Sequence, residues 1–363
     1  MPDQKLNFLI LDGISGVPLG LEIAETLEEL GHTSTHFDCL KQRAIPLYGL
    51  RSAFSKAIDR RTSHDTFYCL PRLDAAALDT LAERSQPNVI LVIGFIYKFF
   101  PPATLRRLAE RHKARLLLYD TDSCNLYSRR REFIYFIEQE LPVYDRILSF
   151  SKVTTRFFRD TRGLDAVHMP FGAKPIPLSN TPKTIDVLFV GSGDLRRIFL
   201  LEAIREHVTV RGNRWQRNAP LISAQLNARI DDRPVWGTEL HTLLASAKIV
   251  LNITRTDFYG AETGVNLRIF EALAAGCFLL TDHCDEIAEL FTVGKELETF
   301  RSSSELADKV RYYLAHDTER ELIAKTGAAT FYGKHTWQER LASTLLPVIS
   351  APSMATAPAT SST

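Results

Sequence analysis

The sequence contains no long hydrophobic run. Nowhere in its 363 residues do about 18 uncharged apolar residues follow one another, so no transmembrane helix is expected. The apolar run in KLNFLILDG, at residues 5–13, is also too short for a secretion signal and leads directly into a glycine turn. We therefore expect this run to form the first strand of a globular protein.

The sequence has few cysteines, and its positive and negative residues are nearly balanced. The formal net charge of +1 provides no whole-protein field for gripping nucleic acid, and no aromatic stacking motif accompanies it. Nucleic acid is therefore excluded as a partner, and any charged ligand must meet local charges. The five cysteines are an odd number without CxxC or Cys/His ligand spacing, which indicates neither disulfides nor zinc and fits a reducing cytoplasm: Cys39, Cys69, Cys124, Cys277 and Cys284.

Short apolar runs alternate with segments of helical periodicity. This alternation predicts an α/β fold with parallel sheets wrapped by helices. In the first half, the strands are expected at FLILDG (8–13), NVILVIG (88–94), RLLLYD (115–120) and RILSFS (146–151), with helices such as 19–31 and 103–115 between them. The pattern restarts at DVLFVGSG (186–193) and continues through VTVRG (208–212), KIVLNI (248–253) and CFLLT (277–281).

The length and this restart predict two domains. The proline-rich segment GAKPIPLSNTPKTI, at residues 172–185, lacks periodicity and is the expected linker. The predicted division is an N-terminal domain 1–172, a linker 173–185, a C-terminal domain 186–334, a C-terminal helix 335–350 and a disordered tail 351–363. One alternative for the C-terminal helix is that it crosses back to the N-terminal domain.

The first candidate site is the turn in VLFVGSGDLRR, at residues 187–197. In sheets of this type, ligands bind beyond the carboxyl ends of the strands, where helix N-termini favour anions. Gly191 and Gly193 would let backbone amides approach a ligand, and Arg196 and Arg197 could reach its charge. The alternative is a tight strand-to-helix turn with solvated arginines.

The second candidate site lies in GVNLRIFEALAAG, at residues 264–276. A helix that begins near Gly264 would aim free N–H groups and a partial positive charge at a diphosphate. Asn266 and Arg268 would stay near the phosphates, and Glu271, about two turns in, could accept hydrogen bonds from a ribose. Alternatively, Glu271 is a surface or ion-paired residue and EALAAG is a packing seam.

The second half resembles the C-terminal domain of CgeB-like glycosyltransferases, which belong with the two-domain GT-B enzymes of the group 1, family 4-like type. The motifs are GVNLRIFEALAAGCFLLTD (264–282), ELF (289–291), SSELADKVRYYLAHDTERELIAKTG (303–327) and HTWQERL (335–341), joined more loosely by LLYDTDS (117–123), YDRILSFS (144–151) and MPFGAKP (169–175). The resemblance implies two Rossmann-like domains facing across a cleft. The C-terminal domain would bind a nucleotide sugar, the acceptor would approach from the N-terminal domain, and no metal or cofactor would take part.

The resemblance also implies site residues. Glu271 matches the second glutamate of the E-x7-E motif of related transferases, where it holds the ribose, whereas strict spacing puts Thr263 at the first glutamate and Glu262 one residue away. This departure leaves the sugar and the stereochemical course open. Trp236 lies in a region that often touches the nucleobase in such folds, and a packing role is the alternative for it.

In the N-terminal half, the polar residues that follow strands allow several interpretations. Asp120 and Asp122, in the run DTD, could coordinate a divalent cation, although a loop, an acceptor contact or a helix cap is the alternative. Asp122 or Asp12 could supply the general base of an inverting reaction. In LDGISGVPLG (11–20), the glycines miss the G-x-G-x-x-G spacing, and Gly13 and Gly16 would line the cleft instead.

The predicted function is metal-independent transfer of a sugar from a nucleotide-diphosphate sugar to a glycan, polysaccharide or protein acceptor. A nucleotide-sugar epimerase and an inactive nucleotide-sugar-binding or structural protein are the alternatives. Arginines beside apolar positions in residues 105–115 and 128–137 leave two interpretations open, peripheral contact with the inner face of a membrane or a solvated helix face.

Overall fold

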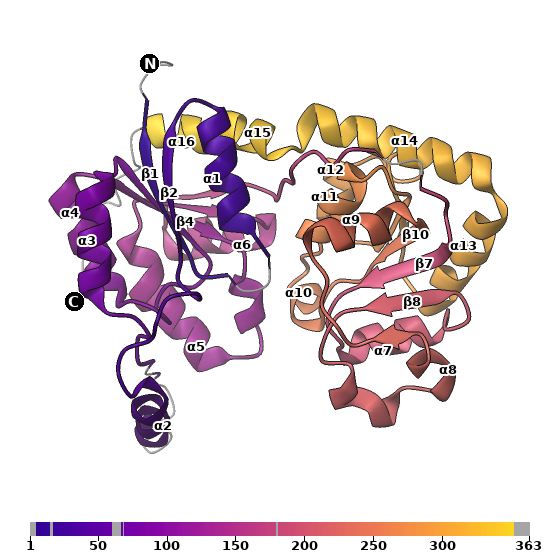
Figure 1. Cartoon of the computed structure of the whole chain (residues 1–363), viewed down its shortest axis with the longest axis horizontal. Helices are drawn as coiled ribbons and strands as arrows, with labels where there is room; N and C mark the ends of the chain where they lie inside the picture. The colour runs from indigo at the N-terminus through magenta and orange to yellow at the C-terminus, as the bar shows by residue number, and fades with distance from the viewer. Residues whose placement is uncertain (1–4, 15–16, 60–66, 68, 179–180, 352–363) are drawn as a thin grey trace. The chain divides into compact units, whose positions relative to one another are not determined.

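The computed structural model describes residues 5–14, 17–59, 67, 69–178 and 181–351. The chain divides into two compact units, Met1–Pro170 together with Leu341–Thr363, and Phe171–Arg340. Each unit holds one six-stranded parallel sheet with helices packed around it (Figure 1). The predicted α/β fold with two parallel sheets is therefore confirmed. Of the predicted tail 351–363, residues 352–363 lie outside the described part of the chain.

The sheet of the first unit has the strand order β2-β1-β3-β4-β5-β6. Its inner strands are apolar between their end residues, as expected for parallel strands that are covered on both faces. Register pairs Asp12 with Ile93 and Asp120 with Ser149, so the carboxyl ends of the strands meet at one edge. The strands are β1 Asn7–Asp12, β2 Thr33–Asp38, β3 Val89–Ile93, β4 Arg115–Asp120, β5 Arg146–Ser149 and β6 Ala166–His168.

The helices of the first unit connect these strands, and the C-terminal segment joins them. Arg146 donates to the Val348 carbonyl and Arg115 to the Ala351 carbonyl, which ties the segment after Leu341 to strands β4 and β5. The helices are α1 Leu19–Glu29, α2 Tyr48–Asp59, α3 Ala75–Ser85, α4 Pro102–His112, η1 Ser123–Leu126, α5 Arg130–Tyr135, η2 Phe136–Glu140, η3 Leu141–Val143, α6 Lys152–Arg156, η4 Phe157–Thr161, η6 Leu341–Leu345 and α16 Leu346–Ser350.

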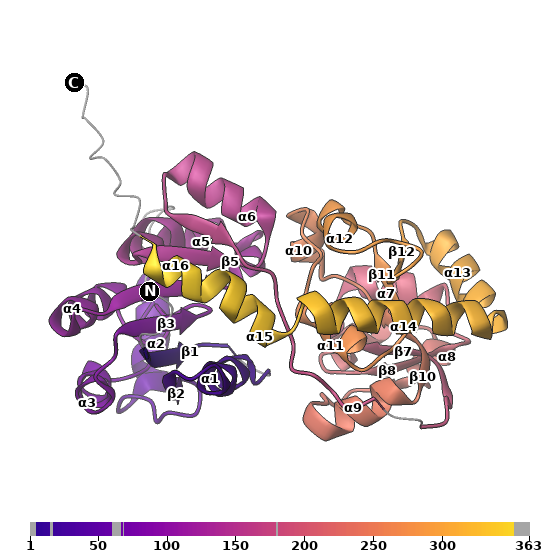
Figure 2. The same ribbon diagram turned by 90° about the horizontal axis from the view of Figure 1, so that it is seen from above.

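The sheet of the second unit has the order β12-β11-β10-β7-β8-β9. Its strands are β7 Ile185–Val190, β8 Val208–Arg211, β9 Ile230–Asp231, β10 Ala247–Asn252, β11 Leu279–Asp282 and β12 Glu298–Phe300. Its helices are α7 Leu195–Glu202, η5 Gln216–Leu221, α8 Ala224–Asn227, α9 Gly237–Ala245, α10 Thr256–Gly260, α11 Leu267–Ala274, α12 Asp285–Leu290, α13 Ser303–Ala315, α14 Asp317–Lys334 and α15 Trp337–Arg340. Helix α11 packs against α14. Figure 2 shows the long helix α14 lying over the sheet of this unit.

Each unit has its own apolar core. The core of the first unit is built on β1, β3 and β4 and includes Phe100 and Phe136, and that of the second unit is built on β7, β8 and β10 and includes Trp215. None of the helices in the described part of the chain combines the length and the hydropathy needed to cross a bilayer. None of the five cysteines, all of which lie in the described part of the chain, forms a disulfide bond.

The two basic segments considered for membrane contact turn their apolar sides inward. In α4, Leu105 and Leu108 are buried in the core of the first unit. In the segment 128–137, Phe136 and Ile137 are buried there too, and Phe133 packs against them. Their apolar side chains are therefore not available to lipid, and the solvated polar face is the interpretation that the structure favours for both segments.

Candidate functional site

The carboxyl ends of β7, β10 and β11 lie next to one another in the second unit. Register pairs Phe189 with Leu251 and Asn252 with Thr281, so the loops that follow these strands leave from one edge of the sheet. The turn after β7 enters α7, the loop after β10 leads through α10 to α11, and β11 ends at Asp282. This edge is where ligands bind in sheets of this type.

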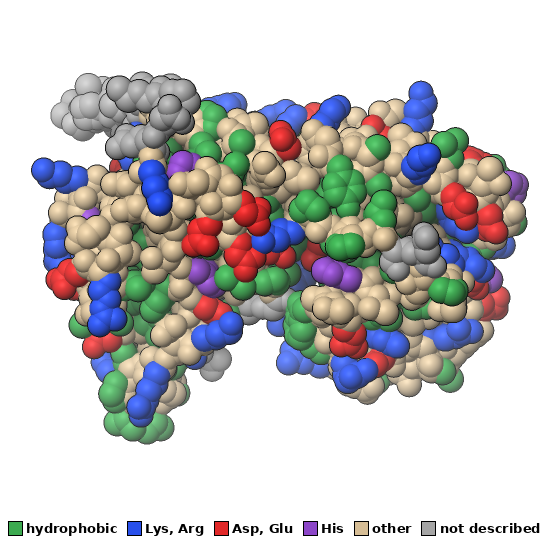
Figure 3. Space-filling view, turned by 45° about the horizontal axis from the view of Figure 1, so that its top comes forward, with side chains coloured by type: hydrophobic (Ala, Val, Ile, Leu, Met, Phe, Trp, Pro, Cys, Tyr) green, Lys and Arg blue, Asp and Glu red, His purple; other side chains and the backbone are tan. Residues whose placement is uncertain are grey.

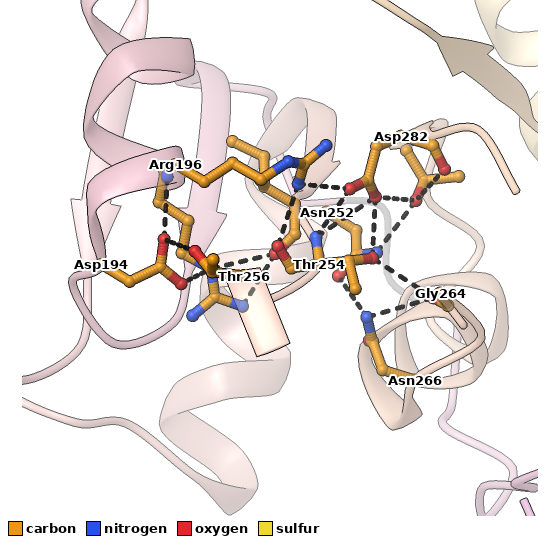
Figure 4. Close-up of polar contacts among 11 residues, drawn as sticks. Asp194, Arg196, Asn252, Thr254, Thr256, Gly264, Asn266 and Asp282 are labelled. Atoms are coloured by element: carbon orange, nitrogen blue, oxygen red, sulfur yellow. Dashed lines mark hydrogen bonds and ion pairs between the residues drawn. The ribbon is translucent and has the colours of Figure 1, made fainter. Parts of the chain in front are cut away.

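Asp282 is the centre of a polar network at this edge (Figure 4). Its buried carboxylate accepts hydrogen bonds from Arg196 Nη1 at 2.6 Å, from the Thr254 amide at 3.0 Å and from Thr254 Oγ1 at 2.9 Å. Arg196 also donates to the Thr254 carbonyl and stacks on the Tyr259 ring at 3.7 Å. Arg196 thus fixes the loop after β10 to the end of β11.

Arg197 differs from its predicted role. It is buried, and its guanidinium donates to the Ile253 and Ser192 carbonyls at 2.7 to 3.0 Å. Burial lowers its pKa to about 10, so it still carries its charge at neutral pH. The expectation that Arg197 reaches a ligand is wrong because its donors hold the two loops together.

The glycines of the first candidate turn are also engaged by protein. The Gly191 amide donates to the Arg211 carbonyl, and the Gly193 amide donates to the Asn213 carbonyl. A Cβ on Gly212 would lie 1.9 Å from the Gly191 carbonyl oxygen, so the two loops touch backbone to backbone. The amides of these two glycines are therefore not available to a ligand, and Gly191 and Gly212 permit close packing of the two loops.

Helix α11 begins at Leu267 and not near Gly264. Asn266 is its N-cap, because its side-chain oxygen accepts a hydrogen bond from the Arg268 amide at 3.0 Å. The Asn266 side-chain amide donates to Asn252 Oδ1 at 3.1 Å and to the Gly264 carbonyl. A Cβ on Gly264 would lie 2.9 Å from Cys284 Sγ, so this glycine lets the loop approach α12. Asn266 therefore shapes the helix start with a side chain that is already hydrogen-bonded.

Arg268 and Glu271 form a pair on the first turns of α11. Arg268 Nη1 lies 2.8 Å from Glu271 Oε2, and the two side chains are 18% and 17% exposed. Nη1 therefore has its acceptor in the Glu271 carboxylate, whereas the buried Nε of Arg268 has no hydrogen-bonding partner. The ion-paired alternative for Glu271 is thus observed, and Arg268 keeps Nε as an unused donor.

The other predicted residues of this unit lie around the site in different environments. Thr263 is buried and donates to Glu286 Oε2 at 3.2 Å, whereas the neighbouring Glu262 is exposed and has a positive φ of 56°. Thr263 therefore places a hydroxyl group, and not a carboxylate, at the position of the first E-x7-E glutamate. Trp236 precedes α9 and is 46% exposed, so it is not a core residue.

In the first unit, the aspartates at the strand ends shape turns. Asp120 is buried and accepts from Ser123 Oγ at 2.7 Å and from Ser149 Oγ at 2.9 Å, and burial raises its pKa despite these bonds. Asp122 accepts from the Asn125 side chain at 2.6 Å. Within the described ranges, no three or more His, Cys, Asp or Glu residues converge on a metal position.

The glycine loop after β1 is held by Asp12. Its carboxylate accepts from the amides of Ile14 and Gly20 and lies 3.3 Å from His36 Nε2. A Cβ on Gly13 would lie 3.1 Å from the Phe95 carbonyl oxygen, which makes Gly13 a packing glycine of this unit. Gly16 lies outside the described residues. Asp12 is thus engaged in the loop and in a contact with His36.

Sequence reasoning missed Asn252, Thr254 and Asp282. All three stand at or just after the ends of apolar strands, in LNIT and LLTD, and this position is the signal that could have found them. Several of their partners are distant along the chain, as in the bonds of Asn266 to Asn252, 14 residues apart, and of Arg196 to Asp282, 86 residues apart. Such pairings become visible only once the sheet order is known.

Comparisons with known proteins agree with this geometry. Residues 196–346 match the model of a family described as glycosyl transferase-like, so this part of the chain carries a glycosyltransferase-like domain. The matched segment runs from the first turn of α7 to the start of α16. A comparison with curated protein sequences finds no match.

Solved structures resemble the chain over nearly its whole length. A glycosyltransferase from Rickettsia africae is 12% identical with a TM-score of 0.61, over 96% of this chain and 98% of that one. Sucrose-phosphate synthase from Thermosynechococcus elongatus is 12% identical with a TM-score of 0.63, over 94% and 98%. HepE from Anabaena, in complex with UDP and glucose, is 12% identical with a TM-score of 0.63, over 94% and 99%. These likenesses show that the chain has the GT-B fold of glycosyltransferases.

Proposed function

We propose that this chain is a glycosyltransferase that uses a nucleotide-diphosphate sugar, as the CgeB-like members of the GT-B group do. The observation that carries the proposal is Arg268 on the first turn of α11, whose buried Nε lacks a hydrogen-bonding partner while Nη1 is paired with Glu271. Buried donors without acceptors are unfavourable by about 1–3 kcal/mol, so a site of this kind is built for a ligand that supplies oxygens. A diphosphate supplies them together with negative charge.

The surrounding residues support this role for Arg268. Asn266 ends the loop and starts α11, so the positive end of the helix dipole and the guanidinium lie within one turn of each other. The network of Arg196, Thr254 and Asp282 holds the neighbouring loop in one conformation. A site that is already ordered before the ligand binds loses less entropy on binding.

In the proposed reaction, Arg268 and the α11 N-terminus stabilise the charge that grows on the leaving diphosphate as the glycosidic bond breaks. Protein charges alone would serve this step, so the proposal includes no metal. Glu271, which is 17% exposed beside Arg268, would accept hydrogen bonds from the ribose hydroxyls. The acceptor is proposed to be a glycan, polysaccharide or protein.

The first experiment is a thermal-shift screen against nucleoside diphosphates and their sugar conjugates, with and without magnesium. UDP leads the panel, because HepE, which shares the fold, was solved with UDP and with UDP-glucose. A ligand that binds only the folded state raises the midpoint with the logarithm of its saturation. We expect one nucleotide series to stabilise the chain equally with and without magnesium, and an absence of any shift would contradict the proposal.

The second experiment measures turnover. With the stabilising nucleotide sugar and a mixture of glycan acceptors, release of the nucleoside diphosphate is expected from the wild type and not from Arg268→Ala or Glu271→Ala. Both variants should keep the wild-type circular dichroism spectrum, because both side chains are partly exposed and neither belongs to the apolar core of the second unit. Full activity in both variants would refute the assignment of the site.

One observation favours a second candidate, a nucleotide-sugar-binding protein without turnover. Thr263 stands where the first E-x7-E glutamate is expected, and its buried side chain donates a hydrogen bond to Glu286. Tight binding of a nucleotide sugar with no product for any acceptor would select this candidate. Binding that is followed by transfer would exclude it.

A further inference from the structure

Helix α2 of the first unit carries large apolar side chains on its outer surface. Leu47, Leu50 and Phe54 are 71%, 72% and 70% exposed. Figure 1 shows α2 standing away from the sheet of its unit, and Figure 3 shows hydrophobic side chains gathered at the tip of this lobe with basic side chains beside them. We call Leu47, Leu50, Ala53, Phe54 and Ala57, all exposed, the α2 apolar strip.

The four members of the α2 apolar strip that belong to the helix share one side of it, and Leu47 directly precedes the helix. Their spacing of three, four and seven residues from Leu50 keeps them within one face of a helix with 3.6 residues per turn. Leu47, which precedes the helix, also has a positive φ of 56°, a conformation that leucine rarely adopts. Leu47 thus has an unfavourable backbone conformation while its side chain faces solvent. Burial of this side chain against a partner would account for the conformation.

Positive charge predominates in the sequence around the strip, although Lys41 Nζ lies 3.3 Å from Asp38 Oδ2. Residues 41–61 contain six basic residues and a single acidic one, Asp59, a net charge of +5 in a chain whose formal net charge is only +1. Among the described side chains, Lys41, Arg43 and Arg51 are exposed. An apolar strip beside a concentration of cations is the pattern of helices that lie in the interface of an anionic membrane.

We propose that α2 docks the protein on the surface of an anionic lipid bilayer. The strip would enter the boundary between headgroups and acyl chains, and Lys41, Arg43 and Arg51 would contact lipid phosphates. A second copy of the chain fits this surface less well, because a two-fold contact would bring two regions of charge +5 together. The proposal concerns the first unit alone and does not depend on the donor site.

The test is co-sedimentation of the full-length protein with vesicles of two compositions, phosphatidylcholine alone and equal parts of phosphatidylcholine and phosphatidylglycerol. We expect binding to the anionic vesicles only, and a loss of this binding when salt is raised, because exposed charges are screened. The double variant Leu50→Ser with Phe54→Ser should bind at least about tenfold more weakly, since each buried methylene favours membrane binding. Binding to neither vesicle would overturn the proposal.

A matched control separates this surface from general hydrophobicity. The double variant Phe199→Ser with Leu322→Ser also removes one phenylalanine and one leucine, which are 68% and 64% exposed in the second unit. It should bind anionic vesicles like the wild type. Equal loss of binding in both double variants would overturn the proposal, as would light scattering that shows a wild-type dimer which only the α2 variant dissociates.

The basic residues have their own variant. Arg43→Glu with Arg51→Glu reverses two exposed charges and leaves the α2 apolar strip intact. We expect its binding to anionic vesicles to fall by more than about tenfold, because each basic residue near an anionic surface contributes about fivefold. Unchanged binding would overturn the assignment of lipid phosphates as the partner.

Discussion

At the scale of single residues, Glu140 is a buried ionisable group in the core of the first unit. It is fully buried at the end of η2 and accepts hydrogen bonds from the Ile96 and Tyr97 amides and from the Tyr144 hydroxyl. Burial raises its pKa to about 7, and the hydrogen bonds oppose this shift only in part. Folding therefore favours a protonated Glu140.

This shift predicts how stability depends on pH. The Glu140 carboxyl has an ordinary value of 4.5 in the unfolded chain, so the folded state binds the extra proton between pH 4.5 and about 7. The contribution of Glu140 to the free energy of unfolding is complete below pH 4.5. It is lost as pH rises through 7, by up to about 3 kcal/mol. Urea unfolding at about pH 5 and about pH 8 should show this loss in the wild type and a smaller one in Glu140→Gln.

The control for this prediction is Glu138→Gln, which alters an exposed glutamate of the same helical turn. It should keep the wild-type dependence on pH. If Glu140→Gln and Glu138→Gln show the same loss of stability between the two pH values, Glu140 is not the group that titrates.

The candidate site could be located from the sequence, but the roles of its residues could not. Arg196, Asn266, Arg268 and Glu271 were singled out because polar residues precede apolar helical runs after strands. The structure adds that Arg196 and Asn266 already have protein partners, whereas Arg268 keeps Nε as an unused donor. The hydrogen-bonding partner of each side chain depends on contacts between segments that are far apart in the chain. Hydrophobic periodicity does not reveal these contacts.

At the scale of elements, helix α14 contains two glycines in opposite environments. A Cβ on Gly327 would lie 2.1 Å from the Glu296 carbonyl oxygen and 2.9 Å from the Leu273 side chain, since α14 packs against α11. A Cβ on Gly333 would meet nothing within 4 Å. One glycine therefore permits a close contact, and the other only lowers the intrinsic stability of the helix.

These two positions give a paired prediction. Gly327→Ala should lower the free energy of unfolding by about 2 kcal/mol, because the methyl group forces backbone apart in a packed interface. Gly333→Ala should raise it by about 0.5–1 kcal/mol, because alanine is the better helix former. Chemical denaturation of both variants measures the difference, and equal effects of the two substitutions would show that α14 does not pack as described.

The strands could be predicted best where both faces are buried. The apolar runs predicted β1, β3, β4, β5, β7, β8, β10 and β11, and all are present. The apolar runs do not predict β2, β6, β9 and β12, which are the edge strands of the two sheets and contain polar residues. The start of α11 was placed near Gly264, too early, because the side-chain cap of Asn266 is a local hydrogen bond and not a periodic signal.

At the scale of the whole molecule, the two units have separate cores and different surfaces. The first unit carries the basic α2 region, and the second carries Arg268 and the segment that matches a glycosyltransferase-like family. The net charge of +1 hides this difference, because the cations of α2 are balanced by acids elsewhere in the chain. The protein is thus expected to meet lipid through one unit and its nucleotide through the other.

This division predicts where a nucleotide changes the dynamics. Bound UDP should slow amide hydrogen exchange in peptides covering residues 189–197 and 252–271, because ordered loops open less often when a ligand holds them. Peptides of α2 should exchange at the same rate with and without UDP. Protection confined to the first unit would contradict the location of the donor site.

The central claim is that Arg268 holds the diphosphate of a sugar nucleotide, and calorimetric titration with UDP tests it most directly. Arg268→Ala should raise the Kd at least about tenfold, as expected for loss of a charge-assisted hydrogen bond. Arg311→Ala is the control, because Arg311 also pairs with an acidic residue three positions away, Asp308, but on the exposed surface of α13. The account predicts wild-type affinity for the control and weak binding for Arg268→Ala, and equal affinity in all three proteins would contradict it.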